Sequence, residues 1–501
     1  MEQTFHTGTQ KILKVLYISL IIQTVIALFF MGFTIYGKVT SAYPNAKLTL
    51  YDGPKTMKTS ADTQVSVNGN KLFVYETNVN NTHTWVSDGN VQLSKTPVTY
   101  FDFDGKAVIE INLPNMKENI TSCTVTPSAN GIVPKISGKT IRFTVDHPGF
   151  YTVEINGSVD RAIHIFANPL EQNIPNPKDP NVVYIGPGEW NVNTITLKDN
   201  QTLYISGGAV VHGMVRSNVA ENITVRGRGI IDGSVNQSWI MDGQTAKVPI
   251  DFRSSKNVNV EGIILLDSNA WVFNCYQLQK ANISNVKLIS ARPNGDGFTL
   301  QSCQDVTVKN CFVRTWDDSL VVKNYGTSTN NITFDNINVW TDLAQSCEIG
   351  YETNKGEQPN AKITNVTFKN ITVLHNFHKP VLSIHNSDDA LVQGIHYQNI
   401  VVEDAEMGEG DAGTNNQLID FGVVSSAWST TAQRGSIKDV TIDGVTVLKG
   451  KTPPSSISGY DAEHMIENVT IKNLTILGKK IKSADDGKFL VDSYAKNVKF
   501  E

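Results

Sequence analysis

Three aspartates stand at the starts of two strand-like runs in the middle of the chain. Asp296 belongs to the segment Asn294-Gly-Asp-Gly-Phe-Thr-Leu300, and Asp317 and Asp318 belong to the segment Thr315-Trp-Asp-Asp-Ser-Leu-Val-Val-Lys323. Adjacent strands lie roughly 4.8 Å apart, so stacking these runs would gather the carboxylates into one cluster. Hydrolysis of a glycosidic bond with inversion needs such a cluster, because one carboxyl protonates the leaving oxygen while others activate a water on the opposite face. Aspartates at strand ends also cap turns, but the repeat pattern around these three favours catalysis.

The composition limits the class of protein. With 501 residues, the chain can bury a large core and divide into two domains. Its net charge of −5 gives no overall positive field for nucleic acid, so we expect no nucleic-acid partner. The five cysteines show no Cys-x-x-Cys spacing, and we predict neither a metal nor an organic cofactor. Four cysteines lie in strand-like runs and are expected to be buried thiols: Cys275, Cys303, Cys311 and Cys347.

The N-terminal segment, residues 1–42, has the pattern of a signal peptide or a membrane anchor. Lys11 and Lys14 precede an apolar run over residues 15–36, and small residues follow as far as Ala42. The apolar run is long enough to span a bilayer, so cleavage near Ala42 and retention as an anchor are both open. Either outcome predicts a secreted or cell-surface protein, membrane-anchored in the second case.

Residues 43–168 predict a β-sandwich domain. Short runs with alternating apolar residues, such as Gln64–Asn68, Ala107–Ile111 and Thr140–Val145, are separated by turn residues. Helical periodicity is nearly absent. Residues 169–180 are rich in proline and asparagine and are interpreted as a linker.

Residues 181–501 repeat a short unit and predict a parallel β-helix that forms the catalytic domain. The unit is an Asn or Asp followed by alternating apolar residues, and it recurs at Asn222, Asn257, Asn282, Asp305, Asn331, Asn365, Asp439, Asn468 and Asn497. A unit of about 25 residues without helices cannot bury its own apolar face and must stack on its neighbours. The general chirality of crossover connections makes the coil right-handed. The predicted fold class is therefore all-β: a right-handed parallel β-helix with an N-terminal β-sandwich.

Recurrent polar residues at the ends of these runs have a structural explanation. Several repeats match the Asn-x-Ser/Thr glycosylation pattern, yet asparagine also tolerates the left-handed backbone of a turn. Because the tripeptides follow the coil period, we predict a turn role for them. The pair Asp388-Asp389, in a turn-like context, is interpreted in the same way.

Alignment of the apolar residues predicts the register of the coils around the aspartates. It places four residues in interior ladders: Phe298, Leu320, Ile349 and Leu382. Alternation then places four polar residues in an outward-facing row beside the aspartates: Gln301, Lys323, Glu352 and His385. Mixed donors and acceptors suit a polyhydroxylated substrate, and Trp316 and Tyr351 add aromatic faces for sugar rings.

The two aspartate motifs resemble those of the inverting glycoside hydrolases of the polygalacturonase and dextranase clan. The match is carried by Asn294–Gly297 and by Asp317-Asp318. Further segments resemble the dextranases and isopullulanases of glycoside hydrolase family 49, in which an N-terminal sandwich also occurs: residues 163–169, 184–188, 205–213 and 225–233. The resemblance covers roughly residues 60–501 and implies a hydrolase that needs no cofactor.

This resemblance implies roles for individual residues. Asp317 matches the first aspartate of the family pair and is implied as the general acid, while Asp296 and Asp318 hold and deprotonate the water. The predicted substrate-binding residues are Asn294, Trp316, Lys323, Glu348, Tyr351, Glu352 and His385.

Two departures from polygalacturonases bear on the substrate. Their Gly-His-Gly motif corresponds here to Ala344–Gly350, which has no histidine, and their Arg-Ile-Lys corresponds to Ser383-Ile-His385. Loss of an arginine removes a bidentate carboxylate recogniser, so the sequence favours dextranase-like hydrolysis of a neutral α-glucan by an extracytoplasmic monomer. The alternatives are a polygalacturonase-type pectin hydrolase, a polysaccharide lyase and a non-catalytic carbohydrate-binding surface solenoid.

Overall fold

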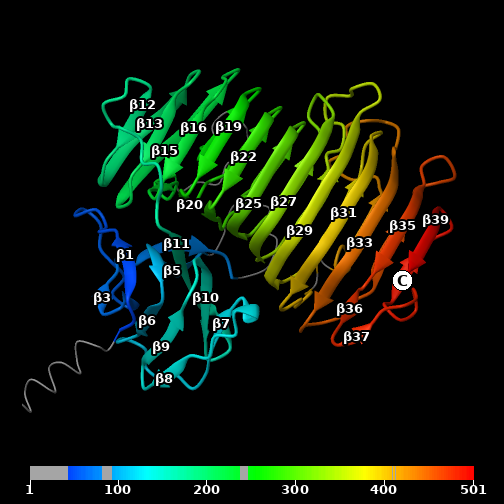
Figure 1. The fold of residues 1–501 in the computed structure, drawn as a ribbon. Coiled ribbons are helices and arrows are strands. Elements are labelled where there is room, and N and C mark those ends of the chain that lie inside the picture. Colours follow the sequence, from blue (N-terminus) through cyan, green and yellow to red (C-terminus); the bar gives the residue numbers. More distant parts are fainter. Residues whose placement is uncertain (1–42, 82–92, 237–245, 409, 412) are drawn as a thin grey trace, which may run out of the picture.

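A computed structural model describes residues 43–81, 93–236, 246–408, 410–411 and 413–501. Within these ranges the elements are β-strands apart from one short 3-10 helix, η1 (Ser128–Asn130). The fold is all-β, with two smaller sheets followed by one sheet of 28 strands (Figure 1). The predicted signal or anchor segment, residues 1–42, lies outside the described residues. Among those that are described, no helix is both long enough and apolar enough to cross a bilayer.

The N-terminal domain is a sandwich of a six-stranded and a five-stranded sheet. The first contains β1 (Ala46–Leu50), β4 (Tyr75–Val79), β5 (Ser94–Gly105), β7 (Cys123–Thr126), β10 (Gly149–Ile155) and β11 (Ser158–Pro169). The second contains β2 (Gln64–Val67), β3 (Asn70–Lys71), β6 (Ala107–Asn112), β8 (Lys135–Ser137) and β9 (Thr140–Val145). Their inward-facing residues form one apolar core. The pairing is antiparallel except between β5 and β11, which run parallel.

The remaining strands stack coil on coil into a parallel β-helix with three ladders of strands. The first contains β12 (Val182–Ile185), β14 (Thr202–Ile205), β16 (Thr224–Gly227), β19 (Lys256–Glu261), β22 (Gln279–Ser284), β25 (Gln304–Thr315), β27 (Thr329–Thr341), β29 (Lys362–Asn376), β31 (Leu391–Val402), β33 (Ser436–Val447), β35 (Ile466–Lys472) and β39 (Ala495–Phe500). The second contains β13 (Gly188–Leu197), β15 (Ala209–Asn218), β17 (Ile230–Asp232), β20 (Ile264–Leu266) and β23 (Lys287–Ile289), and continues through the C-terminal halves of β25 to β33 to β36 (Thr475–Ile476), which forms a hairpin with β37 (Lys479–Lys480). The third contains β18 (Ile250–Arg253), β21 (Phe273–Tyr276), β24 (Phe298–Gln301), β26 (Leu320–Lys323), β28 (Cys347–Tyr351), β30 (Leu382–Asn386), β32 (Ile419–Val423), β34 (Ser455–Ser458) and β38 (Phe489–Val491).

The corners of the coils explain the recurrent asparagines. Asn331 adopts a left-handed backbone with φ 58°, and the equivalent Asn365 and Asp305 have φ 55° and 56°. The side chains also bond along the stack: Asn331 Nδ2 donates to Asp305 Oδ1 at 2.6 Å. The predicted turn role is confirmed for these residues. It is wrong for Asn282, which lies within a strand, and Lys280 (φ 59°) occupies the corner of that coil.

The register near the aspartates differs from the expected one in a single coil. Phe298 pairs with Leu320 as predicted, but Leu320 pairs with Cys347, and Ile349 pairs with Val322. The expected alignment paired Leu320 with Ile349 and was therefore in error by two residues along β28. All four predicted interior residues are nevertheless buried in the solenoid core.

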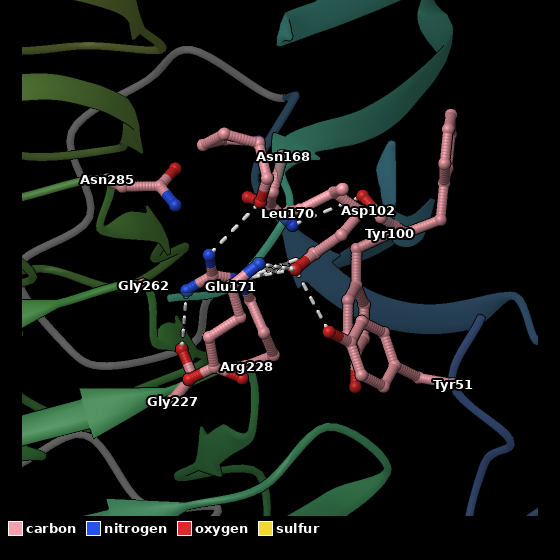
Figure 2. Close-up of polar contacts among 12 residues, drawn as sticks. Tyr51, Tyr100, Asp102, Asn168, Leu170, Glu171, Gly227, Arg228, Gly262 and Asn285 are labelled. Atoms are coloured by element: carbon pink, nitrogen blue, oxygen red, sulfur yellow. Dashed lines mark hydrogen bonds and ion pairs between the residues drawn. The ribbon is translucent and has the colours of Figure 1, made fainter. Parts of the chain in front are cut away.

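The sandwich packs against the solenoid coils from β15 to β29 through an apolar cluster, and a buried ion network adds to this contact (Figure 1). Arg228, which follows β16, binds Asp102 of β5 at 3.1 Å and Glu261 of β19 at 2.8 Å. The Tyr51 hydroxyl donates to the same Asp102 at 3.0 Å, as Figure 2 shows. Asp102 and Arg228 are 0% and 1% exposed, and the charge partner of the buried Asp102 comes from the solenoid.

Candidate active site

The three aspartates lie on consecutive turns that lead into β24 and β26. The Gly297 N–H donates to the Asp318 carbonyl at 2.8 Å, which stacks one turn on the next. A Cβ at Gly297 would come within 2.4 Å of the Ser319 carbonyl oxygen. The glycine after Asp296 is therefore required for close approach of the two backbones, and this approach brings the carboxylates of the two coils together.

Backbone amides and a lysine hold the three carboxylates. Asp317 accepts N–H bonds from Asn294 at 2.8 Å and from Asp318 at 3.0 Å. Asp318 accepts the N–H of Gln345 at 3.2 Å. Asp317 is partly exposed, whereas Asp296 and Asp318 are 3% and 8% exposed. Asp317 is thus the member of the cluster with the most room for contact with a substrate.

Lys323, on β26, is the cation at the centre of the site. Its Nζ lies 3.0 Å from a Glu352 oxygen and 3.6 Å from an Asp296 oxygen. The Tyr325 hydroxyl donates to the other oxygen of Glu352 at 2.7 Å. Burial alone would lower the pKa of Lys323, but the charges of Glu352 and Asp296 raise it well above its usual range. Lys323 therefore stays charged at neutral pH.

The environment keeps protons on the aspartate cluster at neutral pH. Burial raises the pKa of Asp296 to about 7, with Lys323 opposing the rise and Asp317 adding to it. Burial, followed by the charges of Asp317 and Asp296, raises the pKa of Asp318 well above its usual range. Burial also acts on Glu352, but Lys323 and Tyr325 hold its pKa below the usual value. Because the aspartates interact, their protons belong to the cluster as a unit, as acid–base catalysis by paired carboxyls requires.

The cluster opens into a cavity of about 320 Å³. Its walls contain Gln345 and seven of the ten residues singled out as catalytic or substrate-binding: Asn294, Asp296, Asp317, Asp318, Lys323, Tyr351 and Glu352. Charged and polar groups line the cavity together with the aromatic rings of Trp271, Tyr325, Tyr351 and Trp428. The cavity joins the catalytic and binding candidates of the sequence into one site.

Three predicted substrate-binding residues lie outside this lining: Trp316, Glu348 and His385. Trp316 and Glu348 are fully buried, and His385 is 2% exposed. Glu348 accepts hydrogen bonds from Ser383 and binds His385 at 2.9 Å. His385 also binds Asp420 at 3.2 Å. Glu348 and His385 are therefore occupied by neighbours in the stack, and the predicted outward-facing row does not include His385 as an accessible group.

The buried histidine still bears on the site through an aromatic contact. Its ring stacks on Tyr351, with centroids 4.3 Å apart and planes at 3°. Burial lowers the pKa of His385, but Glu348 and Asp420 more than offset this and raise it to about 10. His385 is thus a charged residue that packs against Tyr351, whose ring lines the cavity.

Several lining residues were missed by the sequence reasoning. They are Trp271, Tyr325, Gln345, Lys355, Lys379 and Trp428. Lys355 lies over the Tyr325 ring at 5.1 Å, and Lys379 pairs with Asp411 at 3.0 Å. These lysines follow β28 and β29 on connecting segments that carry no repeat signal, so only the folded arrangement brings them to the aspartates.

The pair Asp388-Asp389 has the predicted turn role. Asp388 accepts N–H bonds from Thr353 at 3.0 Å, from Asn354 at 3.1 Å and from Thr430 at 2.7 Å. Burial acts to raise its pKa, but these donors hold it below the usual value. The four predicted buried cysteines, Cys275, Cys303, Cys311 and Cys347, are buried free thiols.

A parallel β-helix with an N-terminal sandwich and a cavity of three aspartates defines a β-helix glycoside hydrolase. The family model for glycosyl hydrolases family 28 matches residues 189–484. The chain belongs to that family, and it is a glycoside hydrolase of the polygalacturonase and dextranase clan, as the resemblance of its motifs implied.

Similar proteins support the same assignment. "Exopolygalacturonase clone GBGE184" of Arabidopsis thaliana is 27% identical over 165 residues, which cover 31% of this chain and 38% of that protein. "Polygalacturonase" of Prunus persica is 25% identical over 207 residues, covering 38% of this chain and 49% of that protein. The matched segments thus span less than half the length of these relatives. The solved structure "Dex49A from Penicillium minioluteum" shares the fold, with a TM-score of 0.60 and 14% identity over 90% of this chain and 96% of that one.

Proposed function

We propose that the protein hydrolyses a uronate-containing polysaccharide of the pectin type, with inversion at the anomeric carbon. The observation that carries this proposal is a cavity that places Lys355 and Lys379 beside the three aspartates. A polymer of uronates presents one carboxylate per sugar, and two lysines supply charge partners for it without an arginine. The names of the curated relatives support the same substrate class. They favour the pectin alternative over the α-glucan that the sequence favoured.

In the proposed mechanism, the carboxyl of Asp317 gives its proton to the glycosidic oxygen as the bond between that oxygen and C1 breaks. Asp296 and Asp318 orient a water that attacks C1 from the opposite face and gives up its proton to them. Asp317 has the accessibility that this role needs. Burial and the neighbouring carboxylates raise the pKa of Asp318, and because the aspartates share their protons, the assignment requires that one proton reside on Asp317 when substrate binds.

A neutral α-glucan is the second candidate, on a specific observation. The side chains at the positions of the polygalacturonase Arg-Ile-Lys are Ser383 and His385, and both are engaged with Glu348 rather than the cavity. The site therefore lacks an arginine that could bind a uronate carboxylate with two hydrogen bonds.

Release of reducing ends from polygalacturonate and from dextran tests the choice. We expect polygalacturonate to be cleaved, and Lys355→Met and Lys379→Met each to raise KM for it by about tenfold, the loss of one good charge contact of about 1.4 kcal/mol. The matched control is Lys309→Met, because Lys309 is exposed and lies outside the cavity lining. Cleavage of dextran with no release from polygalacturonate would reverse the proposal in favour of the second candidate.

A further inference from the structure

A second cluster of charged side chains lies at the junction of the sandwich and the solenoid. His375 stands at the end of β29, and Asp404 and Glu406 follow β31 in the next coil. One ligand atom from each of these three residues lies within 4.8 Å of the other two. None of the three lines the cavity of the aspartates.

The histidine ring is fixed by partners on its edge and faces. His375 Nε2 binds Glu154 of sandwich strand β10 at 2.9 Å. The ring packs against Trp340, with centroids 4.2 Å apart, and against Phe377 at 5.4 Å. Metal-binding histidines characteristically give their second ring nitrogen to a carboxylate in this way, which fixes the tautomer with Nδ1 as the ligand atom.

The other ring nitrogen points at the carboxylates. His375 is 5% exposed, and its Nδ1 makes no hydrogen bond. It lies 3.4 Å from a Glu406 oxygen, which is an ion-pair distance. A buried nitrogen that faces carboxylates without a hydrogen bond is the observation that points to a ligand here, beyond the cluster of charges.

The two carboxylates can supply oxygen ligands. Asp404 is 6% exposed, and one of its oxygens pairs with Lys449 Nζ at 2.6 Å. The Lys449 side chain is 77% exposed, and that of Glu406 is 41% exposed. Lys449 can therefore swing away into solvent when a cation takes its place, and the opening towards Glu406 leaves a path of entry.

We propose that His375 Nδ1, Asp404 and Glu406 bind one first-row divalent transition-metal ion, with Glu154 orienting the histidine. One imidazole nitrogen and two carboxylate oxygens suit zinc, whereas calcium and magnesium prefer ligand sets made of oxygen. The ion completes four-coordination with water. Since Glu154 belongs to the sandwich and the three ligands belong to the solenoid, the ion fixes the contact between the two domains at a distance from the aspartates.

Calorimetric titration of the chelator-treated full chain with zinc chloride tests the proposal, with calcium chloride as the comparison. We expect one zinc per chain, no binding of calcium at the same concentration, and a higher melting temperature with zinc. His375→Gln and Glu406→Gln should each abolish this binding, and Glu154→Gln should weaken it by about 10–100-fold. Glu406 is half-exposed, so its variant keeps the fold even where His375→Gln does not.

His464→Gln is the matched control, because His464 also pairs with a carboxylate, that of Asp461 at 2.7 Å, and is partly exposed. It should bind zinc as the unaltered chain does. Absence of stoichiometric zinc binding would show that His375 forms an ion pair only. Equal zinc affinity in the unaltered chain and in Glu406→Gln would place the metal elsewhere. Either result overturns the proposal.

Discussion

Replacement of Lys323 by methionine should move the acid limb of the pH–rate profile upwards. Lys323 opposes the rise of the Asp296 pKa, which stands at about 7. At the observed 3.6 Å, two unit charges interact by about 4.6 kcal/mol with an effective dielectric constant of about 20. Since 1.36 kcal/mol corresponds to one pKa unit, the upper limit of the effect is roughly three units. Glu352 also loses its partner and takes up a proton, so we expect a shift of about one to two units.

The direction follows from the proposed role of Asp296 as a base. Removal of a nearby cation disfavours the ionised carboxylate, so its pKa rises and a higher pH is needed to ionise it. The dependence of kcat/KM on pH reports the groups of the free enzyme and is the measurement to make. In the unaltered protein kcat/KM should rise through about pH 7, and in Lys323→Met it should rise through about pH 8–9.

Lys379→Met is the control for this experiment, because Lys379 lines the same cavity but pairs with Asp411. It should change KM and leave the acid limb in place. Thermal unfolding of both variants checks that the folded fraction stays complete over the pH range. An acid limb that Lys323→Met leaves unmoved would refute the claim that Asp296 acts as the base under the influence of Lys323.

Three further outcomes are expected. Asp317→Asn should lower turnover of a polysaccharide by about 10²–10⁴-fold but retain turnover of a glycosyl fluoride, whose leaving group needs no proton; rescue by azide instead of by the fluoride would assign Asp317 to the water side. Asp102→Asn should lower the free energy of unfolding by about 3–5 kcal/mol in a denaturant titration, because it removes one of the two carboxylates that neutralise a buried arginine, and the exposed Asp104→Asn should change it little. Asn331→Ala should cost about 1–2 kcal/mol of stability at its left-handed corner, whereas Asn331→Gly, which loses the same side-chain bond without the strain, should cost less.

Much of the fold follows from local patterns that the sequence displays directly. The Asn corners recur because each coil needs a residue that tolerates positive φ, and alternating apolar residues must face a shared interior. The coil that contains Asn282 is an exception. Lys280 occupies its corner, so the Asn of the sequence motif lies two residues after the corner. The register error at Ile349 has a similar cause, because apolar residues at both Cys347 and Ile349 allow two alignments and only the stacked neighbours choose between them.

In the candidate site, too, some residues could be identified from the sequence and others only from the structure. The Asp296 and Asp317-Asp318 motifs can be recognised in the sequence. The two coils approach so closely that Gly297 is required after Asp296, and this glycine is part of the motif. Lys355 carries no such signal, since it lies on a connection whose path depends on the coils that it joins. The sequence pattern predicts that His385 binds substrate. In the structure it forms ion pairs with Glu348 and Asp420 and stacks on the ring of Tyr351.

The sequence by itself determined the fold class, the acidic cluster and the class of reaction, because each rests on short-range spacing repeated along the chain. Only the tertiary structure decided which side chains reach the cavity and which charges share a buried space. Glu154 and His375 illustrate the difference: they are far apart in the chain and belong to no motif, and packing of the sandwich on the solenoid alone brings them within 2.9 Å. Contacts between domains depend on the three-dimensional course of all the coils between the two residues, and no local sequence pattern predicts this course.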